Sequence, residues 1–238
     1  MFFKHILSLK VLIALLLFFG MISLFIGVIS INVKDILKLN STQLEIITLT
    51  RIPRLIAILL TGMSLSICGL IMQQLTQNKF VSPTTAGTMD CAKFGILVSL
   101  IFFAGASFFT QAIIASVFAL LGSFIFIQIL RKIKLKDVIF VPLIGLMIVS
   151  IITSLVIVSV GIIPFLGLII PNLVALYLGD NLRKNLIYIA LCGALFLLVC
   201  DIISRLVIFP FEMPLSITTG VLGSLIFIFL LLKRKVYA

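Results

Sequence analysis

The chain has 238 residues, of which 63% are hydrophobic and 11% are charged, and its formal net charge is +11. The mean hydropathy of +1.42 excludes an ordinary soluble domain, in which about 45–50% of residues are apolar. Apolar runs about 20 residues long, separated by short polar turns, predict a polytopic membrane protein. The runs are continuous rather than alternating, so the predicted fold class is an all-α transmembrane helical bundle and not a barrel.

Eight candidate spans follow in chain order. They cover roughly residues 6–29, 53–75, 84–104, 110–130, 138–158, 163–178, 185–204 and 214–232. The first is expected to be a retained helix rather than a signal peptide, because it is long and no small-residue cleavage site follows it. The sixth is short and contains Pro164 and Pro171, which predicts a kinked or partly spanning helix. Without a soluble insertion or linker, residues 1–238 are expected to form a single transmembrane domain.

The basic residues indicate the orientation of the spans. With the N-terminus inside, twelve lysines and arginines lie on the inner side, and five lie on the outer side: Lys34, Lys38, Arg51, Arg54 and Arg205. This distribution follows the positive-inside rule and places both termini in the cytoplasm, in a multi-pass protein of the cell membrane. The positive charge is therefore interpreted as a topology signal rather than as a nucleic-acid-binding surface.

The stretch RIPRL, residues 51–55, is unusual because it places two arginines on the outer side. Pro53 suits the first turn of a helix, so the second span is predicted to start near Pro53. Arg54 would then lie at a helix N-terminus, where a cation costs about 0.3–1 kcal/mol. Two interpretations remain open. The guanidinium groups could extend among lipid headgroups, or they could form a docking patch for an acidic partner, whose carboxylates a guanidinium binds bidentately.

A second charged stretch on the outer side is DIISRLVIFPFEMP, residues 201–214. Asp201 and Arg205 are four residues apart, which predicts a local ion pair that Glu212 could share. Such a pair does not exclude a contact between Arg205 and a partner.

A third charged pair lies inside a predicted span. Asp90 and Lys93 are three residues apart, and intramembrane charges are expected to face each other or the interior of the bundle. They form either a buried structural pair near the cytoplasmic end or part of the lining of a transport pathway.

Small residues predict the faces at which helices pack closely. These residues are Gly62, Ser66, Gly69, Ala190, Ala194, Gly220 and Ser224. The four cysteines, Cys68, Cys91, Cys192 and Cys200, also lie in apolar runs and are interpreted as packing residues rather than as disulfides or ligands. With His5 as the single histidine, no metal site, cofactor or catalytic residue is expected. A membrane-embedded enzyme is accordingly disfavoured.

Four stretches taken together resemble the FecCD-type permeases, the membrane subunits of ABC importers for ferric siderophores, haem and cobalamin. They are RIPRLIAILLTGMSLSICGLIMQQLTQN, SPTTAGT, GIIPFLGLIIPN and DIISRLVIFPFEMPLSITTGVLGSLIFIFLL. The resemblance implies a permease dimer, homo- or heteromeric, with a substrate-binding protein outside the cell. It also implies a separate ABC ATPase subunit, and the chain has no nucleotide-binding Gly-x-x-x-x-Gly-Lys-Ser/Thr run of its own.

The resemblance also assigns site residues and a substrate class. It implies that Arg51, Arg54 and Arg205 meet glutamates of the binding protein. The run FVSPTTAGTMDCAKFG, residues 80–95, resembles a subgroup that imports iron–siderophore complexes, so a ferric siderophore is the expected substrate.

The chain departs from the family by being shorter. A pair of helices and the cytoplasmic segment between them, which contacts the ATPase, are missing between VPLIGLMIVSIITSLVIV and SVGIIPFLG. Asn172 also replaces a histidine that many relatives have. Two interpretations therefore remain, a permease that imports iron–siderophore complexes and a truncated, uncoupled paralogue that inserts but does not transport.

Overall fold

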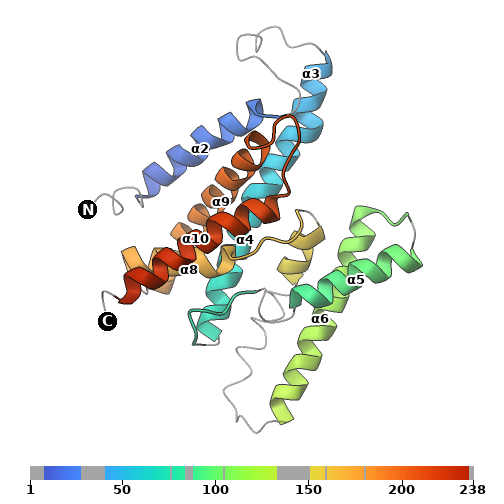
Figure 1. Ribbon diagram of the computed structural model, residues 1–238. Helices are drawn as coiled ribbons and strands as arrows, with labels where there is room; N and C mark the ends of the chain where they lie inside the picture. Colours follow the sequence, from blue (N-terminus) through green and yellow to red (C-terminus); the bar gives the residue numbers. More distant parts are fainter. Residues whose placement is uncertain are drawn as a thin grey trace. The chain divides into compact units, whose positions relative to one another are not determined.

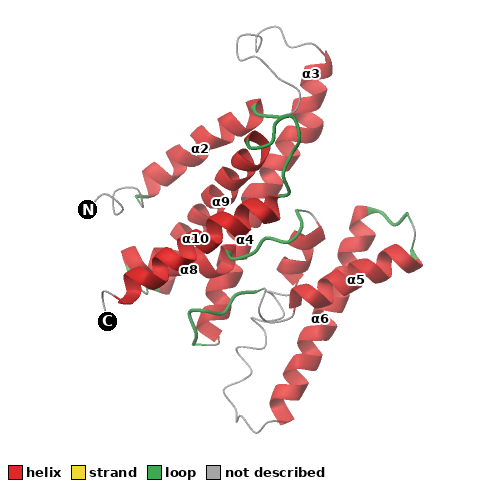
Figure 2. Cartoon of the chain, viewed as in Figure 1, coloured by secondary structure: helices red, strands yellow, loops and turns green. Residues whose placement is uncertain are grey.

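The computed structural model describes residues 8–27, 41–75, 77–83, 88–103, 105–132, 151–158, 160–179 and 181–235. Within these ranges the chain forms helices and loops and no strand, which confirms the predicted all-α class (Figures 1 and 2). The named elements are α2 (Leu9–Phe25), α3 (Ser41–Ile46), η2 (Ile47–Arg51), α4 (Ile52–Leu75), α5 (Thr88–Phe102), α6 (Phe108–Lys132), α8 (Leu166–Leu178), α9 (Leu182–Leu206) and α10 (Leu215–Lys235). Residues 151–158 are also helical.

Most predicted spans correspond to one of these helices. Within the ranges that the structure describes, four helical stretches are long and apolar enough to cross a membrane: Leu44–Gln74, Phe108–Ile125, Lys184–Leu206 and Leu215–Leu232. α8 has 13 residues, about 20 Å of helix, which is shorter than a bilayer core of about 30 Å. The first part of the fifth span, residues 138–150, lies outside the described residues, as does His5. The number of spans therefore stays a prediction.

The chain is divided into two compact units. Unit 1 comprises residues 1–63 and 172–238, and unit 2 comprises residues 64–171. The boundary falls within α4, between Met63 and Ser64. The single domain expected from the sequence stays a prediction.

Unit 1 is built around α9. Both α2 and α10 pack against this helix (Figure 1). α4 approaches it so closely that a Cβ atom on Gly62 would lie 2.5 Å from the carbonyl oxygen of Gly193. Ala194 is fully buried at this contact, whereas Ala190, Gly220 and Ser224 are half-buried. The small residues thus allow the backbones of α4 and α9 to touch.

Unit 2 contains a second close contact, between α4 and the start of α8. A Cβ atom on Gly69 would lie 1.8 Å from the carbonyl oxygen of Gly167. One turn further along α4, the Gln73 side-chain amide lies 3.5 Å from that oxygen and 3.2 Å from the carbonyl oxygen of Leu168. Pro171 has no N–H to donate to the Gly167 carbonyl, so Gln73 supplies a donor that the proline removes from α8.

The prediction that the second span starts near Pro53 is wrong. The helical run begins at Ser41 and continues through the π-helical turn η2 into α4, and Ile52 is itself in the α-region. The wider turn ends at Arg51, two residues before Pro53, and the N–H of Ile52 donates to the carbonyl of Ile47. This turn accommodates the proline inside a longer helix. Arg54 therefore does not lie at a helix N-terminus, and the dipole penalty expected there does not apply.

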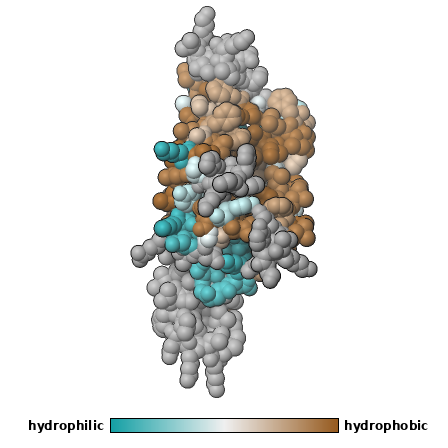
Figure 3. Space-filling view, turned by 90° about the vertical axis from the view of Figure 1, so that its left-hand side faces the viewer, coloured by the Kyte–Doolittle hydropathy of each residue, from teal (hydrophilic) through white to brown (hydrophobic). Residues whose placement is uncertain are grey.

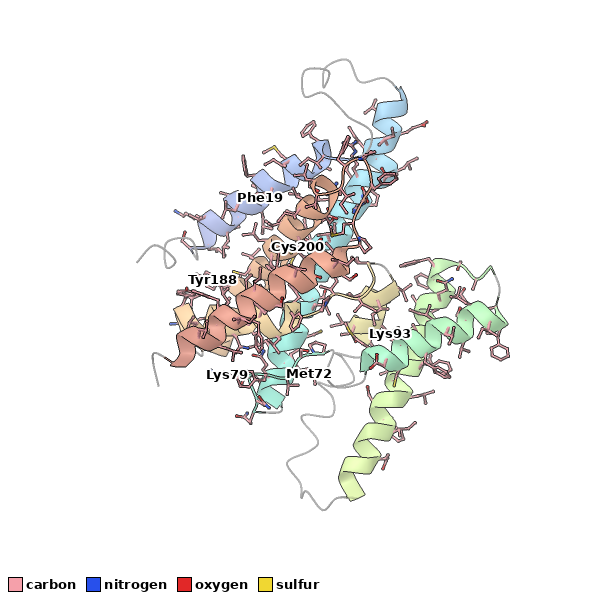
Figure 4. All side chains as sticks on the ribbon, in the orientation of Figure 1. Phe19, Met72, Lys79, Lys93, Tyr188 and Cys200 are labelled. Carbon is pink, nitrogen blue, oxygen red and sulfur yellow. The ribbon has the colours of Figure 1, made fainter. Side chains whose placement is uncertain are left out.

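The four cysteines are free, with Cys68 and Cys200 buried and Cys91 and Cys192 half-buried. Cys200 lies on α9 (Figure 4). The interpretation of these cysteines as packing residues stays a prediction. Figure 3 shows that the described surface on the face it draws is mostly hydrophobic, as expected for helices that face lipid.

Replacement of Gly69 by alanine tests the contact between α4 and α8. The added methyl group would overlap the Gly167 carbonyl, so we expect Gly69→Ala to lower the free energy of unfolding by about 1–3 kcal/mol or more. Gly20→Ala is the control, because its Cβ would meet Leu55 Cδ2 at an ordinary 4.0 Å. Thermal unfolding in detergent measures both, and equal unfolding temperatures for the two variants would contradict the close contact.

Candidate functional site

The ends of several helices meet at one end of unit 1. Four segments come together there: the C-terminus of α2, the η2 turn, the C-terminus of α9 and the loop before α10 (Figure 1). The charge distribution of the sequence predicts that this end of the unit faces the outside of the cell. The three arginines singled out from the sequence all lie here, and we call them and their partners Asp201, Glu212 and Ser23 the outer arginine cluster.

Arg205 is a buried structural residue of this cluster. Its side chain is 4% exposed. Nη1 donates to the carbonyl oxygens of Ser23 and Ile26, at 3.1 and 2.8 Å, and Nη2 donates to the Ser23 hydroxyl at 2.5 Å. Nη2 also pairs with the second carboxylate oxygen of Asp201. Arg205 therefore ties the C-terminal end of α2 to α9.

Asp201 lies at the centre of the cluster, with a side chain that is only 1% exposed. Its Oδ2 pairs with Arg205 and its Oδ1 accepts from Arg54, so two arginines from different helices share one carboxylate. A buried carboxylate is costly unless it is paired and hydrogen-bonded, and both of its oxygens are satisfied here. The predicted pair of Asp201 and Arg205 is present, and Asp201 also holds Arg54.

Arg54 connects the buried centre to the surface. Its Nε and Nη2 donate to Asp201 Oδ1 at 3.2 and 2.9 Å. Its Nη1 donates to Glu212 Oε2 at 2.5 Å. The side chains of Arg54 and Glu212 are 38% and 34% exposed, so this second pair is accessible where the first is buried.

Arg51 follows the same pattern as Arg205. The residue is 8% exposed, and its Nη1 donates to the carbonyl oxygen of Leu24, at the end of α2, at 2.5 Å. Its guanidinium also lies close to Gly27, where an added Cβ would be 3.2 Å from Nη2. Arg51 and Arg205 thus cover the carbonyl groups that α2 leaves without intrahelical donors at its C-terminus.

A cleft of about 210 Å³ opens into the cluster. It is lined by Ile26, Gly27, Ile46, Thr50, Arg51, Arg54, Arg205 and Glu212. The cleft gives an approaching group access to a surface that three arginines and one carboxylate, that of Glu212, line. Among the described residues, no group of three or more His, Cys, Asp or Glu side chains could hold a metal ion.

For Arg51, the structure contradicts the interpretation that the arginines of residues 51–55 extend among lipid headgroups, whereas for Arg54, whose side chain is 38% exposed, this interpretation stays open. Arg51 and Arg205 are turned inward, because the carbonyl ends of α2 and the Asp201 carboxylate provide acceptors within the chain. Ser23 was not among the predicted site residues, and its signal in the sequence is a small polar residue near the end of an apolar helix. Glu212 was expected to share the pair of Asp201 and Arg205, whereas it pairs with Arg54.

Asp90 and Lys93 form an ion pair of 2.7 Å on α5 (Lys93 is labelled in Figure 4). The pair is not buried as the first interpretation expected, since the two side chains are 72% and 42% exposed. Asp90 lies in the first turn of α5, where the helix dipole favours a carboxylate. A role in lining a transport pathway stays a prediction.

Long apolar helices with a charged cluster at one end define a polytopic membrane protein, and comparison with known proteins identifies its family. The model of the FecCD transport family matches residues 15–158 and 137–233. The chain belongs to this family.

Two curated relatives match along most of their length. The petrobactin import system permease protein YclN of Bacillus subtilis is 39% identical over 315 aligned residues, which cover 97% of this chain and 100% of the relative. The ferric-anguibactin transport system permease protein FatD of Vibrio anguillarum is 30% identical, with 89% of this chain and 94% of the relative covered.

A solved structure, described as an inward-facing conformation of a metal-chelate type ABC transporter, has the same fold. It matches with a TM-score of 0.81 over 93% of this chain and 97% of that chain, at 20% identity.

The comparisons also locate the segment by which this chain is shorter than its relatives. The alignment with the B. subtilis relative is longer than this chain and still reaches all of the relative, so the missing part is internal. The two family matches overlap at residues 137–158, which means that this segment fits the family model in two places. The overlap lies at the point where the sequence analysis placed the missing pair of helices.

Replacement of Asp201 tests the buried part of the cluster. Asp201→Asn removes the charge that two arginines share, so we expect a loss of about 3–5 kcal/mol in the free energy of unfolding. The control is Glu212→Gln, which breaks a partly exposed pair and should cost less than about 1 kcal/mol. Unfolding in mixed detergent micelles measures both changes, and equal losses would show that Asp201 is not the centre of the network.

Proposed function

We propose that the chain is the permease subunit of an ABC importer that carries iron–siderophore complexes across the cell membrane. The observation that carries this proposal is the 39% identity to a petrobactin permease over the whole length of that protein. A second petrobactin permease, FatD of Bacillus anthracis, is 29% identical over 91% of this chain. The substrate class is therefore a ferric siderophore, and which siderophore is transported is a question for uptake assays.

The outer arginine cluster is proposed as the docking site for the substrate-binding protein. Arg54 is the residue of the trio with an exposed guanidinium edge, and it borders the cleft. Arg51 and Arg205 border the same cleft but are held by α2, so they contribute positive charge, while Asp201 holds the guanidinium of Arg54 in place. Charges at such a surface mainly set the association rate and the register of a complex.

The remaining partners follow from the same proposal. The chain pairs with a second permease, identical or homologous, and the transport pathway lies between the two. A separate ATPase subunit on the cytoplasmic side hydrolyses ATP, and the permease itself catalyses no reaction. Docking of the loaded binding protein and ATP hydrolysis then drive alternating access to the pathway.

Uptake of radioactive iron tests the proposal. In an iron-starved host with this chain as its one siderophore permease, we expect uptake that disappears with an ATPase-dead subunit. Arg54→Glu places a negative charge on the docking surface and should reduce uptake at least about tenfold. Lys10→Glu, a charge reversal on α2 away from the cleft, should leave uptake nearly unchanged. Absence of ATPase-dependent uptake by the unmodified chain contradicts the proposal.

A second candidate function is supported by the internal gap. The missing segment is the one that, by family resemblance, contacts the ATPase, so the chain could be an uncoupled paralogue that inserts and pairs but does not transport. Co-purification distinguishes the two. A coupled permease retains the ATPase subunit in detergent, whereas an uncoupled paralogue loses it under conditions in which a full-length relative keeps it.

A further inference from the structure

The exposed pair of Arg54 and Glu212 leads to one further inference, which rests on the proposed docking function. We propose that Glu212 occupies, in the undocked permease, the position on Arg54 that a carboxylate of the binding protein takes on docking. Glu212 would thus be an internal competitor that docking displaces. Three features of the cluster support this exchange.

The first feature is the way the Arg54 guanidinium is divided between its two carboxylates. Nε and Nη2 face Asp201, which is 1% exposed and which Arg205 also holds. Nη1 faces Glu212 at 2.5 Å. An incoming carboxylate cannot reach the inner edge without breaking a buried charge network, which is strongly unfavourable. It can take the outer nitrogen by replacing Glu212.

The second feature is the weakness of the pair to be replaced. Arg54 and Glu212 are 38% and 34% exposed, and exposed ion pairs contribute little to stability because water and salt screen them. An exchange of one carboxylate for another on the same nitrogen conserves the hydrogen bond and the charge balance. The displacement is therefore easily reversible, as repeated docking and release require.

The third feature is the location of Glu212. It lies in the loop between α9 and α10, two residues before Pro214, and lines the cleft together with Arg54. Ile208, Phe209 and Phe211 in this loop are exposed, whereas Met213 is anchored through its N–H to the carbonyl of Ser204 at 3.0 Å. Glu212 therefore lies between an exposed part of the loop and the anchored Met213, at a position where its carboxylate can leave Arg54 without breaking the bond of Met213.

Binding measurements on the full chain in lipid nanodiscs test the proposal. The probe is a soluble form of the host's siderophore-binding protein. Glu212→Gln removes the competing charge and keeps the shape of the side chain, so we expect it to tighten docking by about three- to fivefold. The matched control is Glu45→Gln, which removes the same charge from an exposed position of α3 that does not line the cleft. It should change the dissociation constant much less.

A double-mutant cycle connects the effect to Arg54. Arg54→Lys keeps a positive charge for Asp201 but lacks the outer nitrogen of the fork, so it should weaken docking and abolish the gain from Glu212→Gln. Size-exclusion elution in detergent identifies variants that fail to fold.

The outcomes separate this inference from the docking proposal. If Arg54→Lys weakens docking but Glu212→Gln does not tighten it, the inference alone is overturned. An equal gain from Glu45→Gln also overturns it, since the effect would then be one of net charge. If Arg54→Lys leaves the affinity for the binding protein unchanged, the proposed docking function is overturned, and the inference with it.

Discussion

One buried carboxylate, that of Asp201, holds the outer end of unit 1 together. Its two oxygens bind arginines from α4 and α9, and the second of these arginines extends to the end of α2. In a low-dielectric environment two such cations would repel each other strongly without the shared anion. The carboxylate therefore permits a concentration of positive charge at a membrane surface. The charge-sharing arrangement also explains why Arg205 and Arg51 are buried while Arg54 keeps an exposed edge.

Away from the charged cluster, α4 packs closely against its neighbours because glycines on it have no side chain. Gly62 brings α4 against α9, and Gly69 brings it against the start of α8. Close backbone contact of this kind compensates for the lack of a hydrophobic driving force between helices in lipid. Gln73 adds a donor where Pro171 removes one, so the interruption of α8 does not leave its carbonyls without partners.

The helices were predictable from the sequence because an apolar run about 20 residues long has few alternatives in a bilayer. The start of the second span was not predictable, since Pro53 is a good first-turn residue. No local feature of the sequence indicates that a π-helical turn precedes the proline and continues the helix. The arginines were recognised as unusual from charge alone, but the Ser23 groups on α2 that Arg205 binds lie some 180 positions away from it. Such partners depend on tertiary packing, which residue spacing does not encode. The Asp90–Lys93 pair illustrates the reverse case, because residues three apart on a helix can be paired from sequence while their burial cannot.

The chain belongs to the FecCD transport family and lacks an internal segment relative to the B. subtilis permease. It contains the outer arginine cluster and its supporting helices, which are the parts that the proposed docking function needs. The proposed docking function requires that this cluster face the outside of the cell. A cysteine at Phe211, which is 74% exposed in the loop beside Glu212, can be labelled with a membrane-impermeant maleimide in a background without the four native cysteines. We predict labelling in intact cells, with a cysteine at Asn181 labelled only after the cells are opened. The opposite pattern would contradict the account.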